Sequence, residues 1–301
     1  MPSLWLCSFL ATVAVAIPPP PPVDQGEINV VFRPNITQDD DAPVSFKYRY
    51  VAKNGAVYHS HPRLEVITIA ATTHVSDQAM EKAAITVGLM IKHMQKVCIP
   101  VLPPDWAWVC FTKAEGLTVY PEMSSHTDTP SCHSSCKGSC AHTCISDGRK
   151  FSTIGGLTSR RSYVVDDNVL CNSHDAYHKT LNVLSHEFAH QIMFHLDKYW
   201  RERIHKAYND IHAKGTWKLS SYAMRNQDEY FAEATTAFFL SSHMIGANGG
   251  MNVCGSGTHI CSSVSTARAY LRQHDPEIFA VLEYVYTGNR PDVYVPLKTC
   301  M

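Results

Sequence analysis

The chain has 301 residues, of which 45% are hydrophobic and 18% are charged, the balance of a globular protein with one large or two small domains. Its formal net charge of -1 gives no electrostatic footprint for nucleic-acid binding and argues against that class of function. Two residue types are frequent, with 17 His and 11 Cys, so metal binding and disulfide bonding are the chemistries to examine.

Residues 1–16 have the pattern of a secretory signal peptide. An apolar run from Leu4 ends in Ala14-Val15-Ala16, an A-x-A cleavage signature. A membrane anchor is the alternative, but the run is short for a bilayer span of about 20 residues. Cleavage would remove Cys7 and leave ten cysteines, enough for up to five disulfides in an oxidising compartment. We therefore expect a secreted, extracellular protein with no stable membrane span.

Residues 17–62 form a Pro-rich and acidic stretch that we interpret as an extension or a pro-segment. It begins with IPPPPPV, which favours an extended polyproline II rod, and carries the acidic run Asp39 to Asp41. Asn35 begins an N-I-T sequon, which predicts a glycoprotein if the chain is secreted. A short strand is expected at residues 45–51.

Residues 63–301 are expected to form the main domain. Residues 63–71 alternate in β-branched residues and predict a strand, and Ser76 or Asp77 begins a helix predicted to run to Met94. A second strand is expected between Cys98 and Phe111. Strand, helix and strand in this order indicate a small mixed sheet.

Residues 124–148 form a polar, Cys-rich insert. Its four cysteines are spaced by four residues, and His133 and His142 lie nearby, so a second zinc site is one interpretation. Structural zinc sites more often pair their thiolates as C-x2-C, and a secreted chain favours disulfides on such a loop. Cys254 and Cys261 bracket a Gly-rich loop and predict another local disulfide.

Three more helices are predicted in the second half, at residues 175–200, 228–243 and 276–285, the last capped by Asp275. The first contains His186-Glu187-Phe188-Ala189-His190, an HExxH motif. Residues four apart share one helix face, so both imidazoles could bind one metal ion while Glu187 flanks it as a general base.

A catalytic zinc needs a third protein ligand, and three candidates compete. His195 would point around the helix from His190, and Glu202 lies too close along the chain to fold back easily. The metzincin spacing fails, because its glycine and third histidine are Met193 and Leu196 here. The third candidate is Glu229, four residues before Glu233 on one face of an apolar helix.

Two buried carboxylates on that helix would be costly without partners. One carboxylate on the metal and one on a metal-bound imidazole would satisfy both. The favoured ligand set is therefore His186, His190 and Glu229 around one Zn²⁺, with Glu233 behind a histidine ring. Tyr222 lies seven residues before Glu229, and its hydroxyl could donate to an oxyanion at the open position.

HEFAH, followed by a tyrosine and then E-Y-F-A-E seven residues later, resembles the catalytic domain of anthrax toxin lethal factor and the related secreted Pro-Pro endopeptidases. The resemblance implies the same set: His186, His190 and Glu229 as zinc ligands, Glu187 as general base, Tyr222 at the oxyanion and Glu233 behind the ligands. It implies an α+β, mainly helical metallopeptidase domain with a small mixed sheet, here stabilised by disulfides.

These features together predict a secreted zinc endopeptidase that acts on a protein or peptide substrate. The alternative is a catalytically silent, zinc-containing, toxin-like or adhesive binding module. Because the Pro-Pro branch cuts between prolines, self-cleavage within residues 18–22 is a further hypothesis, and a stiff linker is the simpler interpretation of that tract.

Overall fold

The computed structural model describes residues 46–99, 108–112, 114–133, 135–145, 148–159, 161–255, 259–295 and 297. The predicted signal peptide, the proline tract and the Asn35 sequon lie outside these residues. Of the predicted extension 17–62, residues 46–62 are described, and they contribute the first two strands of the main sheet.

The described strands form a six-stranded mixed sheet in the order β2-β1-β3-β4-β6-β5. β3 pairs in parallel with β4, and β4 with β6, while the outer pairs are antiparallel. The expected strand at 45–51 is β1, in the second position. The strands are β1 (Phe46–Ala52), β2 (Val57–Tyr58), β3 (Val66–Thr72), β4 (Trp108–Phe111), β5 (Gly156–Thr158) and β6 (Ser162–Val165). A separate hairpin is made by β7 (Val253–Cys254) and β8 (His259–Ile260).

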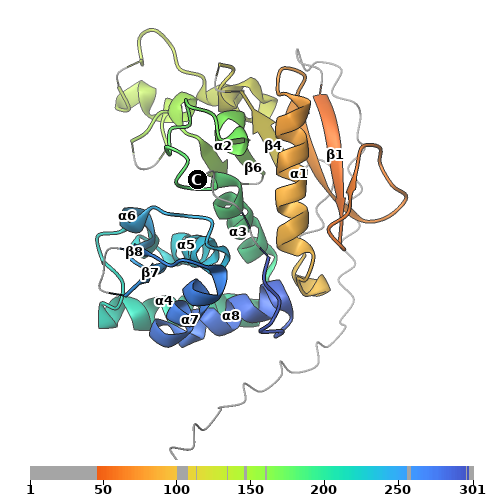
Figure 1. Cartoon of the computed structure of the whole chain (residues 1–301). Coiled ribbons are helices and arrows are strands. Elements are labelled where there is room, and N and C mark those ends of the chain that lie inside the picture. The colour runs from red at the N-terminus through yellow and green to blue at the C-terminus, as the bar shows by residue number, and fades with distance from the viewer. Residues whose placement is uncertain are drawn as a thin grey trace, which may run out of the picture. The chain divides into compact units, whose positions relative to one another are not determined.

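Helices cover the sheet and form most of the second half of the chain. α1 packs on β1 and β3, and α3 lies between the sheet and a group of helices made of α4, α5, α7 and α8 (Figure 1). The α+β expectation is confirmed. The helices are α1 (Asp77–Ile91), α2 (Asp166–Leu170), α3 (Val183–His195), α4 (Lys198–Lys214), α5 (Gln227–Phe239), α6 (Ile245–Asn248), α7 (Val264–His274) and α8 (Pro276–Thr287).

The helix predicted over residues 175–200 is wrong at both ends. Residues 175–182 form turns, and His178 and Lys179 have φ angles of 50° and 65° in the left-handed region. α3 begins only after Asn182, whose side chain accepts a hydrogen bond from the Ser185 amide. Asp197 then caps α4 by accepting from the Trp200 amide. Because Asn and Asp side chains satisfy the first amides of a helix, two caps divide the apolar pattern into separate helices.

The Cys-rich insert is closed by disulfides, which leaves no thiolates for the second zinc site. Cys132 pairs with Cys140 and Cys136 pairs with Cys144. The predicted local bridge between Cys254 and Cys261 is also present. Three such pairs fit a chain that folds in an oxidising, extracellular environment.

Cys98 is a buried free thiol. Burial, with a smaller contribution from the nearby Asp197, raises the pKa of the Cys98 thiol to about 12. The thiolate form is therefore suppressed at neutral pH, and Cys98 is a packing residue rather than a nucleophile.

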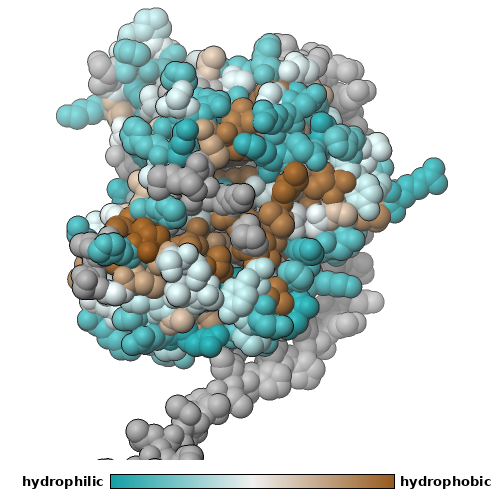
Figure 2. All heavy atoms as spheres, in the orientation of Figure 1, coloured by the Kyte–Doolittle hydropathy of each residue, from teal (hydrophilic) through white to brown (hydrophobic). Residues whose placement is uncertain are grey.

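The face of the molecule in Figure 2 is mostly hydrophilic over the insert and has an apolar area over the middle of α1, where Ile85 is 45% exposed. Within the described ranges, no helix combines the length and the apolar composition that crossing a bilayer requires.

Candidate metal centre

α3 carries the HExxH motif as a buried helix. Its start is fixed twice, because Asn182 caps it and the Asn168 side chain accepts a hydrogen bond of 2.9 Å from the Val183 amide. Asn168 also donates to the Leu181 carbonyl, which ties the incoming chain to α2. His186 and His190 stand one turn apart on the same face, with ring centroids 4.8 Å apart.

α5 brings Glu229 to these two rings. The Asn226 side chain caps α5 by accepting hydrogen bonds of 2.9 Å from the amides of Asp228 and Glu229, so Glu229 lies in the first turn. α5 packs along α3. The Glu229 Oε2 atom lies 3.2 Å from His186 Nε2 and 3.4 Å from His190 Nε2, and the two Nε2 atoms are 3.2 Å apart.

These three donor atoms have the spacing of one face of a tetrahedral zinc site. Zinc–nitrogen and zinc–oxygen bonds of about 2.0–2.1 Å at a tetrahedral angle place ligand atoms about 3.3 Å apart. The Glu229 Oε2 atom is buried and accepts no well-directed hydrogen bond from the described residues, although both rings lie within reach. His186, His190 and Glu229 therefore form a group that could hold a metal ion.

Two further side chains predicted from the sequence lie against this group. Glu233 is 1% exposed, and its Oε1 atom lies 3.2 Å from His186 Nδ1, on the ring edge away from Glu229. The Tyr222 hydroxyl donates a hydrogen bond of 2.8 Å to Glu229 Oε1, the oxygen that does not face the rings. Both contacts orient residues of the donor group.

Glu187 lies beside the donor group and is 7% exposed. Its Oε2 atom accepts a hydrogen bond of 2.6 Å from Thr158 Oγ1, on the edge strand β5. β5 approaches closely at Gly156, where an added Cβ would lie 2.7 Å from Glu187 Oε1 and 2.4 Å from Val183 Cγ1. The sequence analysis missed both β5 residues. The available signal was the Gly155-Gly156 pair, because consecutive glycines mark turns and close approaches of the backbone.

Burial and pairing shift the acidity of the site residues in opposite directions. Burial raises the pKa of the Glu187 carboxyl, which makes it a stronger base than an exposed glutamate. Burial would also raise the pKa of Glu229, but pairing with the His186 and His190 rings holds it well below its usual range. Burial opposes the charged form of His186, yet Glu229 and Glu233 together raise its pKa well above the usual value. A cation bound at the donor group would therefore compete with protonation of His186.

The donor group lies in an open cleft with a volume of 860 Å³. One wall comes from β5, from Ile145 of the Cys-rich insert and from Arg149, the first residue after it. The opposite wall comes from α4 and from the start of α5. Glu187, Tyr222 and the three donor residues all line this space, so a ligand in the cleft could reach each of them.

The two competing ligand candidates lie outside the donor group. His195 directs Nδ1 at the Gln191 carbonyl within its own helix, at 2.7 Å. Glu202 lines the cleft but lies 3.6 Å from Lys198 on the exposed face of α4. Among the described residues, His186, His190 and Glu229 are the one group of three or more His, Cys, Asp or Glu residues with donor atoms close enough for a shared ion.

Comparison with known proteins found no matching family model, no matching curated protein and no matching solved structure.

Proposed function

We propose that this protein is a zinc-dependent endopeptidase. The observation that carries the proposal is the triangle of His186 Nε2, His190 Nε2 and Glu229 Oε2, with edges of 3.2, 3.2 and 3.4 Å, which fits three ligands of a tetrahedral zinc ion with one open position. The donor chemistry supports zinc in particular, because two imidazoles and one carboxylate are a ligand set of catalytic zinc sites. The open cleft beside it would admit a peptide.

A bound zinc ion would act as a Lewis acid and lower the pKa of water in the site. Glu187 takes the proton from the attacking water and passes it to the leaving amine. Its buried position supports this role, because a raised carboxyl pKa brings its basicity closer to the working pH. The Tyr222 hydroxyl, which donates to Glu229 Oε1 in the structure, would turn to donate to the oxyanion during the reaction. Burial, aided by the neighbouring Glu229, raises the pKa of Tyr222 and keeps it protonated.

The resemblance of this motif set to lethal factor and the Pro-Pro endopeptidases supports the same assignment. Secretion is part of the proposal, and the three disulfides that join described cysteines to one another fit it. A binding module that keeps zinc only for stability is the second candidate. It leaves unexplained why a buried carboxylate, Glu187, faces an open cleft beside the donor group.

The test uses the full secreted chain, loaded with Zn²⁺, and the Glu187→Gln variant. We expect about one zinc per chain in both proteins, because Glu187 is not in the donor set. The parent should cleave sites in a proteome-derived peptide library and lose this activity with a chelator, while the variant should be inactive on every site. Full activity in the variant would remove Glu187 as the base. A parent that holds zinc but cleaves nothing would favour the binding module.

A further inference from the structure

We infer that the cleft selects peptides that carry an acidic side chain near the scissile bond, and that Arg149, held in place by the Cys-rich insert, binds that carboxylate. The inference rests on the proposed peptidase function and adds the substrate class. Its support comes from three features of the described residues: how the insert reaches the cleft, how it is held rigid, and how charge is distributed along the cleft.

The C-terminal end of the insert reaches the cleft where the chain turns back between Ile145 and Arg149, the first residue after the insert. The Ile145 amide donates a hydrogen bond of 2.8 Å to the Arg149 carbonyl, and the Gly148 amide donates one of 2.9 Å to the Ile145 carbonyl. An isolated antiparallel bridge between Cys144 and Lys150 closes the base of this turn. Ile145 and Arg149 both line the cleft that contains the donor group, so the turn carries one apolar and one cationic side chain to it.

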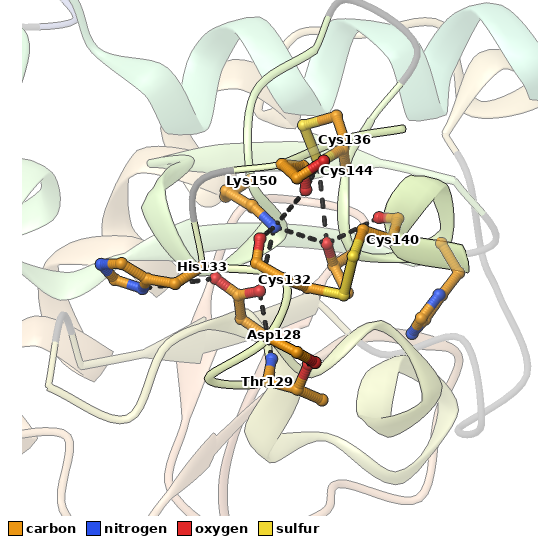
Figure 3. Close-up of polar contacts among 12 residues, drawn as sticks. Asp128, Thr129, Cys132, His133, Cys136, Cys140, Cys144 and Lys150 are labelled. Atoms are coloured by element: carbon orange, nitrogen blue, oxygen red, sulfur yellow. Dashed lines mark hydrogen bonds and ion pairs between the residues drawn. A yellow bond between two sulfur atoms is a disulfide. The ribbon is translucent and has the colours of Figure 1, made fainter. Parts of the chain in front are cut away.

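The base of the turn is held rigid from inside the insert. The side chain of Lys150, two residues after the insert, reaches into it. The Lys150 Nζ atom donates to Asp128 Oδ1 at 2.9 Å, to the Ser135 carbonyl at 2.8 Å and to Thr143 Oγ1 at 2.7 Å (Figure 3). The Cys132 carbonyl also accepts from it. The two disulfides enclose this cluster, and one of them ends at Cys144, next to the turn. The ammonium thus links separate parts of the insert directly beside Arg149.

Arg149 lines the cleft that contains the donor group. Its side chain hydrogen-bonds Tyr177, whose ring lies so close to Gly155 that a Cβ there would meet Cε2 at 2.8 Å. Gly155 precedes the β5 residues that contact Glu187. Arg149 lines the same cleft as Tyr222 and the three donor residues, so a substrate carboxylate bound to it would lie within the cleft that holds the donor group. A guanidinium fixed in this way can form a charge-assisted hydrogen bond with a substrate carboxylate at a low entropic cost.

The remaining charges of the cleft favour the same substrate. Among the described residues, four cationic side chains line it, and outside the donor group and Glu187 two carboxylates do, an excess of two positive charges (4 − 2). The cations are Arg149, Lys198, Arg201 and Arg225, and the carboxylates are Glu202 and Asp228. A bound divalent cation would offset the carboxylates of Glu187 and Glu229, so the described lining as a whole would keep this excess of two (4 − 4 + 2). An acidic peptide would be attracted to the cleft and a basic one repelled.

The test measures binding in the Zn²⁺-loaded Glu187→Gln protein, so that no peptide is consumed. Fluorescent peptides are used in matched pairs. The two peptides of a pair differ only at one position near the middle of the peptide, where one has Glu and the other Gln, and this position is moved from pair to pair. We expect the Glu peptide of the best pair to bind about fivefold more tightly. Arg149→Ala should remove this preference, Arg149→Lys should keep most of it, and Arg149→Glu should transfer it to a Lys-containing peptide.

Lys137→Ala is the matched control, because Lys137 is an exposed cation of the same insert that does not line the cleft. It should keep the Glu-over-Gln preference of the parent. Zinc content and thermal midpoint should be equal in all variants, which separates recognition from a structural effect. No Glu-over-Gln preference in the parent, or the same preference in Arg149→Ala, would overturn the inference. Preferential binding by the Glu187→Gln protein without any cleavage by the parent would instead overturn the peptidase proposal alone.

Discussion

Gly156→Ala tests the packing of the edge strand β5 against α3 without touching the donor group. An alanine Cβ at this position would lie 2.4 Å from Val183 Cγ1 and 2.7 Å from Glu187 Oε1, whereas ordinary contacts begin near 3.4 Å. The strand and α3 must therefore separate by about 1 Å (3.4 − 2.4). Gly156 has no positive φ, so the penalty comes from this overlap and not from backbone conformation.

Overpacking of this kind costs about 1–3 kcal/mol in free energy of unfolding. For a domain of this size, each kcal/mol lowers the thermal midpoint by about 2–4 °C, so we expect a fall of about 2–12 °C. The same shift moves the Glu187 carboxylate, and a displacement of about 1 Å at a catalytic group can reduce the rate about 100-fold. Zinc stoichiometry should be unchanged, because the three atoms nearest the added Cβ belong to Val183 and Glu187 and not to a donor residue.

Differential scanning calorimetry, zinc analysis and peptide cleavage measure the three effects. Gly246→Ala is the control, because a Cβ at this position in α6 would meet no atom within 4 Å and its φ is not positive. If Gly156→Ala has the same thermal midpoint as Gly246→Ala and cleaves peptide at the parent rate, β5 does not pack on Glu187 as described. A normal midpoint with reduced cleavage would instead mean that the strand adjusts while the carboxylate moves.

Three further predictions concern the support of the site. Asp275→Ala leaves the Trp217 indole N–H and the Tyr230 hydroxyl buried without their shared acceptor, and urea unfolding should show a loss of about 2–5 kcal/mol. Glu233→Gln removes the carboxylate behind the His186 ring, and zinc affinity in a chelator competition should fall about 10–100-fold, while the exposed Glu202→Gln control should have no effect. The carboxylates of Glu229 and Glu233 raise the pKa of His186, so zinc must displace a proton from this ring. Zinc affinity should therefore fall as the pH is lowered from about 8 to about 5.5, with about one proton released per bound ion. Calorimetry in two buffers of different ionisation enthalpy measures this release, and a ring that is already neutral would show none.

The parts of the site that the sequence could predict depend on local geometry or on a simple cost. His186 and His190 share a face in any α-helix, so their convergence follows from spacing alone. Glu229 was favoured because two carboxylates on an apolar helix need partners, and the structure brings Glu229 to both rings and Glu233 to one of them. Neither argument required knowledge of how α3 and α5 are connected.

Other features depend on chain segments that no local pattern relates. Thr158 and Gly156 reach Glu187 because β5 pairs antiparallel to β6 at the sheet edge, a pairing set by the whole sheet. Arg149 reaches the cleft because the disulfides and Lys150 shape the insert, and four cysteines allow three connectivities. The helix bounds failed for a more local reason, since apolar periodicity continues across Asn182 and Asp197 while their side chains cap new helices.

The position of Glu229 depends on a buried polar cluster on another side of α5. Tyr230 is the next residue, so its side chain leaves the helix about 100° around the axis from that of Glu229. The Tyr230 hydroxyl donates a hydrogen bond of 2.6 Å to Asp275, the cap of α8, and Trp217 donates to the same oxygen at 3.0 Å. These bonds fix the rotation of α5 from behind, while Tyr222 fixes the Glu229 carboxylate from the cleft side. A donor triangle with edges near 3.3 Å tolerates little rotation of α5, so the Asp275 cluster and Tyr222 together keep the carboxylate within metal-binding distance of the two rings.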